Sequence, residues 1–281
     1  MGAPDQATKA EAFRALHHGD EALVLPNVSD AGTAVLTASM GFPALATASA
    51  GVAWAQGYPD GEQMERGEML EAVRRIASRV ALPVSADMEG GYGATPEEVA
   101  ETVRLTLEAG AIGVNLEDGL DHAAGTMRDM GLANDCIKAA RSAGQDAGIP
   151  VVINARTDVY FDKGASEENK LSDAITRANA YLEAGADCAF VIAVTEGAAI
   201  GDLVREIDGP VNIVGGAGGL DIKALADLGV RRISMAGGMT RTTFGVLKNA
   251  LSEILETGGI SFLQGGMAHP QLNQLFERDD L

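Results

Sequence analysis

The chain alternates short apolar runs with amphipathic stretches eight times along its 281 residues. The apolar runs are continuous, which is typical of parallel strands covered on both faces. We expect strands at 22–26, 44–47, 83–86, 112–116, 150–153, 188–192, 210–214 and 231–235. Eight strand–helix units in a chain of this length predict an α/β fold, the (β/α)8 TIM barrel.

Helical periodicity between these strands supports the same architecture. It predicts helices that include 64–80, 96–109, 134–147, 173–184, 220–228 and 243–256. An extra helix is expected within residues 1–20, and a polar helical tail over 268–281. We find no linker, so the sequence predicts a single barrel domain over residues 1–281. A doubly wound sheet is the competing fold, but no glycine-rich dinucleotide motif follows the first strand.

Composition limits the partners and the compartment. Lys and Arg number 21 against 40 Asp and Glu, which gives a net charge of −19. Such a surface should repel nucleic acid and anionic membranes, although solubility alone explains most of the charge. The two cysteines, Cys136 and Cys188, have no metal-ligand spacing. No signal peptide and no membrane-spanning run is recognisable, so we expect a cytoplasmic protein.

Acidic residues follow two neighbouring strands. Asp87 and Glu89 end the third strand at spacing i, i+2, and Glu117 ends the fourth. Residues two apart in a strand point to one side, and carboxylates with room for water suit Mg²⁺ or Mn²⁺. Any one of these acids could simply cap a helix or face solvent. Three on adjacent strands favour a metal site at the carboxyl ends, where such barrels keep their chemistry.

The next strand ends in Asn154 and Arg156. Arginine is permanently cationic and can hold a carboxylate or an enolate at two points. An ion pair of Arg156 with Asp158 or Glu117 is the alternative, and the two roles are compatible. Asn27 stands at the end of the first strand and is a further candidate for substrate binding.

Small and glycine-rich segments follow other strands. Ser49, Ala50 and Gly51 offer a hydroxyl and backbone N–H groups that could hold a carboxylate, or they form only a tight turn. Residues 215–219 resemble a phosphate cradle, or are ordinary turns. His122 lies in a polar loop that could close over a site as an acid or base, although a solvated histidine fits equally. The other histidines, at positions 17, 18 and 269, are expected on the surface.

On these residues the chain resembles the isocitrate lyase/phosphoenolpyruvate (PEP) mutase superfamily, in its short branch. The matching segments are, in order, 25–32, 41–51, 58–60, 86–93, 113–119 and 153–158. The resemblance implies a (β/α)8 barrel that binds Mg²⁺ and 2-oxo or 2-hydroxy carboxylic acids. It also implies a homo-oligomer, a dimer or a tetramer, often with exchanged C-terminal helices.

The resemblance also implies roles for individual residues. Asp87 would anchor the metal, with metal-bound waters held by Asp60, Glu89 and Glu117. The substrate carboxylate would bind Ser49, Ala50 and Gly51, and the developing enolate would bind Arg156.

The loop at 119–131 departs from the superfamily pattern. It lacks the Lys-(Lys/Arg)-Cys-Gly-His sequence of the isocitrate and methylisocitrate lyases, and also the Lys and Asn of the phosphonate enzymes. Ala193-Val194-Thr195 follows the sixth strand where several members have a histidine. The enolate-forming core is therefore present without the familiar reaction-specific residues.

The sequence leads to one main functional hypothesis. It is a Mg²⁺-dependent lyase or decarboxylase that cleaves a C–C bond in a small 2-oxo or 2-hydroxy acid through an enolpyruvate-like intermediate. Glu117, a water held by Glu89, or His122 would be the acid or base. The alternatives are a C–P hydrolase or phosphonomutase acting on a phosphonopyruvate-like substrate, a phosphosugar isomerase or aldolase, and a non-catalytic metabolite-binding protein.

Overall fold

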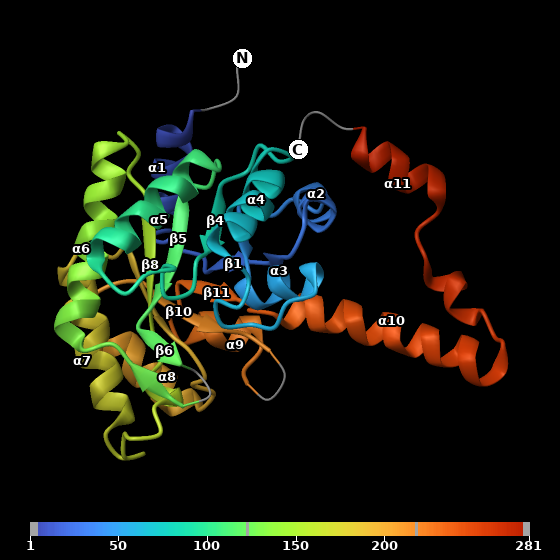
Figure 1. Cartoon of the computed structure of the whole chain (residues 1–281). Coiled ribbons are helices and arrows are strands. Elements are labelled where there is room, and N and C mark those ends of the chain that lie inside the picture. The colour runs from blue at the N-terminus through green and yellow to red at the C-terminus, as the bar shows by residue number, and fades with distance from the viewer. Residues whose placement is uncertain (1–4, 122–123, 217–218, 278–281) are drawn as a thin grey trace.

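Nine parallel strand segments form the barrel at the centre of the molecule (Figure 1). The structure is a computed structural model that describes residues 5–121, 124–216 and 219–277. In spatial order the segments are β1 (Leu23–Leu25), β11 (Arg232–Ser234), β10 (Val211–Val214), β9 (Cys188–Val191), β8 (Val152–Thr157), β5 (Gly113–Glu117), β4 (Val84–Asp87), β3 (Leu45–Thr47) and β2 (Asn27–Val28).

The barrel closes through its first strand. β1 and β2 are separated only by Pro26, which has no N–H to donate to a neighbouring strand. The first half pairs with β11 and the second half with β3, so one interrupted strand joins the two edges of the sheet. The eight strands predicted from the sequence are all present, and the (β/α)8 prediction is confirmed.

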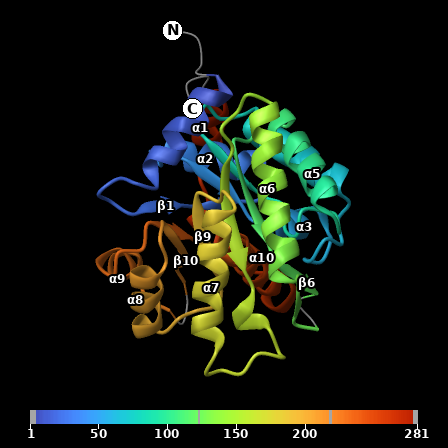
Figure 2. The same cartoon turned by 90° about the vertical axis from the view of Figure 1, so that its left-hand side faces the viewer.

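Helices surround the strands, and Figure 2 shows α5, α6 and α7 standing on the outside of the barrel. The described helices are α1 (Gln6–Leu16), α2 (Ala31–Ser39), α3 (Ser49–Gln56), α4 (Arg66–Ala77), α5 (Pro96–Glu108), α6 (Met130–Asp146), α7 (Lys170–Glu183), α8 (Gly197–Glu206), α9 (Ile222–Asp227), α10 (Gly238–Thr257) and α11 (His269–Phe276), with short 3-10 turns at Val159–Phe161 and Ser261–Gly265. Helix α5 begins with a capping box between Thr95 and Glu98.

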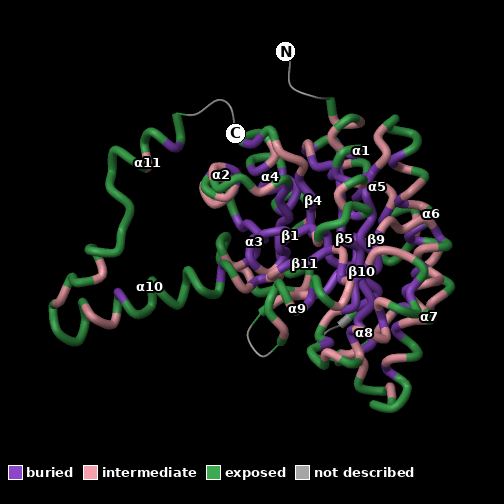
Figure 3. The backbone as a smooth tube through the Cα atoms, turned by 180° about the vertical axis from the view of Figure 1, so that it is seen from behind, coloured by how far each residue is buried: buried purple, intermediate pink, exposed green. Residues whose placement is uncertain are grey.

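The strands are buried and the outer helix faces are exposed, as Figure 3 shows. Continuous apolar strands can be buried on both sides because helices cover one side and the barrel interior the other. Helix α1 packs with the amino-terminal parts of the strands, where Phe13 shares a buried cluster with Leu25, Ile112 and Val152. The carboxyl ends of the strands, which carry the predicted site, lie at the opposite end of the barrel.

Two segments near the predicted site differ from one of the local structures considered for them. Ser49 to Gly51 do not form a turn but begin helix α3, so their N–H groups belong to a helix amino terminus. The segment after β5 is not an open loop. It forms a two-stranded antiparallel hairpin of β6 (Gly119–Asp121) and β7 (Thr126–Met127).

The carboxyl-terminal helices form an arm. Helix α10 leaves the barrel and is mostly exposed along its length (Figures 1 and 3). Helix α11 packs against α2, where Leu275 is buried beside Val35, and the carbonyl of Phe276 accepts a hydrogen bond from Arg79. Across the described residues, no helix is long and apolar enough to cross a membrane.

Candidate active site

Asp87 lies at the centre of the predicted site, at the end of β4. Its Oδ2 accepts hydrogen bonds from the backbone N–H of Ser49 at 2.9 Å and from the Ser49 hydroxyl at 3.0 Å. Its own N–H donates to Oγ1 of Thr47 at 2.8 Å. The amino terminus of helix α3 therefore holds this carboxylate, because helix N–H groups favour negative charge.

Glu89 lies on the turn that follows β4, in a left-handed conformation with φ of 51°. Its Oε2 accepts a hydrogen bond from the N–H of Glu62 at 2.6 Å, and Tyr92 approaches its other oxygen at 3.4 Å. The Glu62 carboxylate in turn accepts from the N–H of Tyr92 at 2.9 Å. These bonds join the segment after α3 to the turn after β4, and they fix Glu89 over the barrel mouth.

The acidic side chains repel one another. Burial raises the pKa of Glu89 to about 8, and the negative charges of Asp87, Glu117 and Asp60 add to this shift. Asp60 is exposed on the segment after α3, but its charge is close enough to be felt at Glu89. Four carboxylates therefore share one region at the end of the barrel.

Arg156 carries the positive charge of the site, at the end of β8. Its Nη1 lies 2.6 Å from Oε2 of Glu117, which is its register partner on β5. Nε and Nη2 contact the two oxygens of Asp158 at 2.6 Å and 2.9 Å. Arg156 also stacks over the ring of Phe190. Both predicted ion pairs are present, and they hold the guanidinium rigidly beside the acids.

Asp118 is buried and stabilises the positions of Asp158 and its neighbours through hydrogen bonds. Its Oδ1 accepts from the N–H of Asp158 at 2.8 Å, and its Oδ2 accepts from the hydroxyl of Tyr181 and from Arg177. Burial raises the pKa of Asp118 even though these hydrogen bonds and Arg177 favour its charged form. The buried carboxylate thus ties the ends of β5 and β8 together.

Arg128 joins the hairpin to the turn that carries Glu89. This buried side chain follows β7 and donates to the carbonyls of Gly90 at 2.7 Å, Glu117 at 3.2 Å and Gly93 at 2.6 Å. It is the only cation of the 119–131 segment, a signal that could have suggested its role. Arg128 was not among the residues predicted from the sequence.

The two asparagine candidates are occupied by contacts within the barrel. Asn27 donates to the carbonyl of Thr47 at 2.8 Å and accepts from the N–H of Met235 at 2.7 Å, so it secures the closure of the barrel. Asn154 is fully buried and donates to the side chain of Asn115 at 2.8 Å. Their substrate-binding roles stay predictions, and His122 lies outside the described residues.

The donor set fits a hydrated divalent ion better than a fully protein-bound one. Among the described residues, no three Asp, Glu, His or Cys side chains converge closely enough to hold a metal ion directly. Mg²⁺ usually keeps several waters and takes one or two carboxylates from the protein. The assignment of Asp87 as the direct ligand, with Asp60, Glu89 and Glu117 on metal-bound water, stays a prediction.

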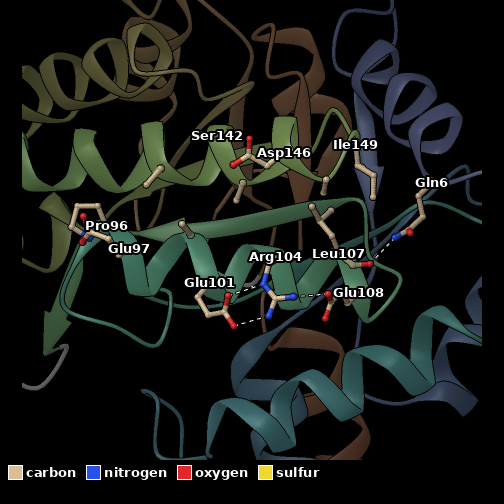
Figure 4. Close-up of a pocket in the computed structure, with 14 residues that line it drawn as sticks. Gln6, Pro96, Glu97, Glu101, Arg104, Leu107, Glu108, Ser142, Asp146 and Ile149 are labelled. Atoms are coloured by element: carbon tan, nitrogen blue, oxygen red, sulfur yellow. Dashed lines mark hydrogen bonds and ion pairs between the residues drawn. The ribbon is translucent and has the colours of Figure 1, made fainter.

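A groove lies elsewhere, between helices α5 and α6 (Figure 4). It has a volume of about 730 Å³ and is lined by Glu101, Arg104, Ser142 and Asp146, among others. Arg104 is paired with Glu101 and Glu108 on its own helix. None of the predicted site residues lines this groove, so it is separate from the strand-end site.

A known protein family matches most of this chain. Residues 13–255 match the phosphoenolpyruvate phosphomutase family. The chain belongs to this family. It is therefore an enzyme of the isocitrate lyase/PEP mutase superfamily, as its motifs predicted.

Relatives in this superfamily carry different activities in their names. An uncharacterised protein of Mycobacterium tuberculosis is 34% identical over 222 residues, 79% of this chain and 80% of that protein. The 2-methylisocitrate lyase of Escherichia coli is 33% identical over 66% of this chain and 62% of the lyase. An oxaloacetate decarboxylase of Rhodopseudomonas palustris is 35% identical over 65% of this chain and 62% of its own length.

Solved structures agree on the fold. A Burkholderia cenocepacia protein described as a candidate lyase or mutase superposes with a TM-score of 0.91 at 38% identity, covering 98% of both chains. A second protein from that organism, described as a candidate phosphonomutase, gives 0.82 at 40% identity over 91% of this chain and all of the other. An oxaloacetate acetylhydrolase in complex with oxalate gives 0.86 at 22% identity, over 97% and 95% of the two chains, which shows the common fold.

Proposed function

We propose that this family member is a Mg²⁺-dependent lyase or decarboxylase that breaks a C–C bond in a small 2-oxo or 2-hydroxy acid. The observation that carries the proposal is the pairing of Arg156 with Glu117 beside Asp87 and Glu89. A fixed cation next to a carboxylate cluster suits an enolpyruvate-like oxyanion, because both the metal and the guanidinium would face the developing charge.

Each residue would have a defined task. The amino terminus of α3, with the Ser49 hydroxyl, would hold the substrate carboxylate. Arg156 would hold the oxygen that gains negative charge as the C–C bond breaks and its electron pair moves into the oxo-acid fragment. Bound Mg²⁺, or Mn²⁺, would supply Lewis acidity at that oxygen. Glu117, which contacts Arg156, or a water held by Glu89 would move the proton.

A second function has its own support. The family model is that of a phosphomutase, and a 40% identical structure is described as a candidate phosphonomutase. Release of inorganic phosphate from phosphonopyruvate would identify C–P hydrolysis, whereas conversion to PEP would identify mutase activity. Pyruvate formed from oxaloacetate or from a 2-hydroxy acid would identify C–C cleavage instead.

Oxalate binding tests the shared core before any substrate is known. Oxalate is a flat dianion that resembles the enolate of pyruvate, and its binding can be measured by calorimetry with and without Mg²⁺. We expect binding in the micromolar range or tighter for the wild type with Mg²⁺, and a loss of at least roughly a hundredfold for Asp87→Ala. Asp146→Ala, which removes an acid from the α5–α6 groove, is the matched control and should bind normally.

The outcomes separate the hypotheses. Metal-dependent binding followed by turnover of an oxo or hydroxy acid supports the lyase proposal. Metal-dependent binding without turnover across a broad panel of acids supports a non-catalytic binding protein. Binding that ignores both Mg²⁺ and Asp87 would reject the enolate site.

We also propose that the protein forms a homo-oligomer through its carboxyl-terminal arm. Helix α10 exposes an apolar face at helical spacing, formed by Phe244, Leu247, Leu251, Ile254 and Leu255. Leu255 is 88% exposed, and an exposed apolar face of this length is costly in water. A second copy can cover it, because the same face on each chain gives a self-complementary contact.

Light scattering after size-exclusion chromatography tests this proposal. The wild type is expected to elute as a dimer or tetramer, and Leu251→Glu with Leu255→Glu is expected to shift it towards the monomer. Asn249→Glu, at an exposed position on the opposite side of the same helix, is the control. A monomeric wild type at micromolar concentration would refute the proposal.

A further inference from the structure

The barrel interior below the candidate site is polar rather than apolar. Asn154 donates to Asn115 at 2.8 Å and approaches Asn212 at 3.4 Å, and Asn212 donates to the hydroxyl of Ser234 at 3.1 Å. Arg232 completes this layer from β11. Most polar atoms of this layer are hydrogen-bonded to one another, but Oδ1 of Asn154 and Nε of Arg232 are buried with no hydrogen-bond partner among the described residues, which is costly in a barrel core.

Arg232 is the unusual member of the layer because it is fully buried without an ion pair. Its Nη2 donates to Oδ1 of Asn115 at 3.1 Å and to Oγ of Ser85 at 3.3 Å, and its guanidinium faces the ring of Phe13. Within the described ranges, no carboxylate lies at ion-pairing distance from it. Burial lowers the pKa of Arg232 to about 10, so it is still charged at neutral pH.

A further contact of Arg232 is also with an uncharged group. His17 from α1 lies with Nε2 at 3.4 Å from Nη1, and its Nδ1 lies 2.9 Å from the carbonyl of Phe13. Burial lowers the pKa of His17 to about 3, so the ring is neutral at physiological pH. With its Nδ1–H donated to Phe13, Nε2 is left as an acceptor for the guanidinium.

Arg232 lies one layer below Asp87 and Glu117 in the barrel. Ser85 precedes Asp87 by two residues, and Asn115 precedes Glu117 by two. Residues two apart point to the same side of a strand and are separated by about 7 Å. Arg232 therefore contacts the inward-facing side chain directly below each of two predicted metal carboxylates.

We propose that Arg232 is a positioning residue whose buried charge sets the electrostatic balance of the site, weakening cation binding and strengthening anion binding. The inference rests on the proposed function, since it concerns the same metal and enolate site. A positive charge at this depth opposes a divalent ion at Asp87 and attracts a dianion at Arg156. Water does not screen it, because the barrel encloses it.

Calorimetry can detect these two opposite effects. We would titrate Mn²⁺ into wild type, Arg232→Met and Arg232→Gln, and then titrate oxalate at saturating Mn²⁺. We expect both neutral variants to bind Mn²⁺ roughly tenfold more tightly and oxalate roughly tenfold more weakly than the wild type. Arg232→Lys should stay within about threefold of the wild type in both titrations.

Controls separate charge from packing. Arg205→Met removes an exposed arginine, which lowers the net charge by the same amount far from the barrel interior, and should change neither affinity. Each variant is first checked by circular dichroism and thermal unfolding. If Arg232→Met does not fold, Arg232→Gln still provides a neutral side chain that can form hydrogen bonds.

Three results would overturn the inference. The first is a folded neutral variant that binds Mn²⁺ as the wild type does. The second is weaker binding of both Mn²⁺ and oxalate, which is what a merely structural role predicts. The third is a wild-type protein that binds no divalent ion, which rejects the metal site of the proposed function and this role with it. Normal wild-type binding with unchanged variants would instead leave the proposed function intact.

Discussion

His17 provides a test of the barrel's closed end that is independent of the reaction. The ring is 1% exposed, packs edge-on against Phe13 at 4.9 Å between centroids, and accepts from Arg232. Burial lowers its pKa, the positive charge of Arg232 lowers it further, and Asp187 opposes the shift weakly. The folded protein therefore resists protonation of a group that the unfolded chain protonates readily.

The size of the effect follows from the two pKa values. In the unfolded chain the His17 pKa is about 6.5, and in the folded protein it is about 3. Between these values the unfolded state binds one more proton, so the free energy of unfolding falls by about 1.4 kcal/mol for each pH unit of acidification. From pH 7 to pH 5 the His17 contribution falls by about 2 kcal/mol, a substantial part of a typical domain's stability.

The assay compares wild type with His17→Gln by urea unfolding at pH 7, 6 and 5. Glutamine can donate to the carbonyl of Phe13 and accept from Arg232, but it does not titrate. We expect the variant to be less stable at pH 7 because it loses ring packing, and to gain about 2 kcal/mol relative to wild type by pH 5. His18→Gln removes an exposed neighbouring histidine and should follow the wild-type profile.

The comparison between variants removes the contribution of other titrating groups, including Glu89. Parallel pH profiles for wild type and His17→Gln would refute the reasoning, because they would show that His17 is protonated equally in both states. If wild type instead became more stable than His17→Gln as the pH falls to 5, the predicted direction of the His17 pKa shift would also be wrong.

Three other predictions concern the carboxylates and their turn. Glu117→Gln should lower turnover of the substrate by roughly a hundredfold or more in a protein that still folds, because Arg156 keeps its pairing with Asp158; wild-type turnover would remove Glu117 from the mechanism. In the metal-free protein, the raised pKa of Glu89 costs stability as pH rises from 4.5 to about 8, so Glu89→Gln should be more stable at pH 8 by about 1–3 kcal/mol in thermal unfolding and no different near pH 4. Gly91 has φ of 92°, and an added Cβ would lie 3.0 Å from Val99, so Gly91→Ala should lower the unfolding free energy by about 1–3 kcal/mol. Gly41 also has a positive φ but has open space around it, so Gly41→Ala is the control that shows the effect of backbone strain alone.

Much of the fold was predictable because its signals are local. A continuous apolar run followed by a polar residue marks both a strand and its carboxyl end, and this pattern located Asp87, Glu117 and Arg156 together. The predicted helix boundaries differ from the structure by a few residues at most ends. The start of α3 at Ser49 was missed because Ala48, its N-cap residue, offers no side-chain capping signal.

What the sequence did not reveal depends on contacts between distant segments. His17 was expected on the surface, yet it is buried because α1 packs under the barrel, and its spacing from Ala10 and Phe13 on one helix face was the available signal. The bonds of Arg128 to the Glu89 turn and of Asp118 to Tyr181 join residues that no local pattern relates. The pair Arg231 and Arg232 at the start of the predicted strand at 231–235 was equally informative, and it was not used.

The hydrogen bonds between Ser49 and Asp87 imply an order of events. In the metal-free protein the Ser49 N–H and hydroxyl are both donated to the carboxylate of Asp87. An anion can accept these hydrogen bonds only after they have been broken from Asp87. A cation bound to the Asp87 carboxylate would weaken them, because the carboxylate oxygen would then interact with the cation. If the proposed cation and acid bind at this site, the cation would therefore have to bind before the acid. In steady-state kinetics, an ordered mechanism of this kind would make the acid's apparent affinity rise with the concentration of metal.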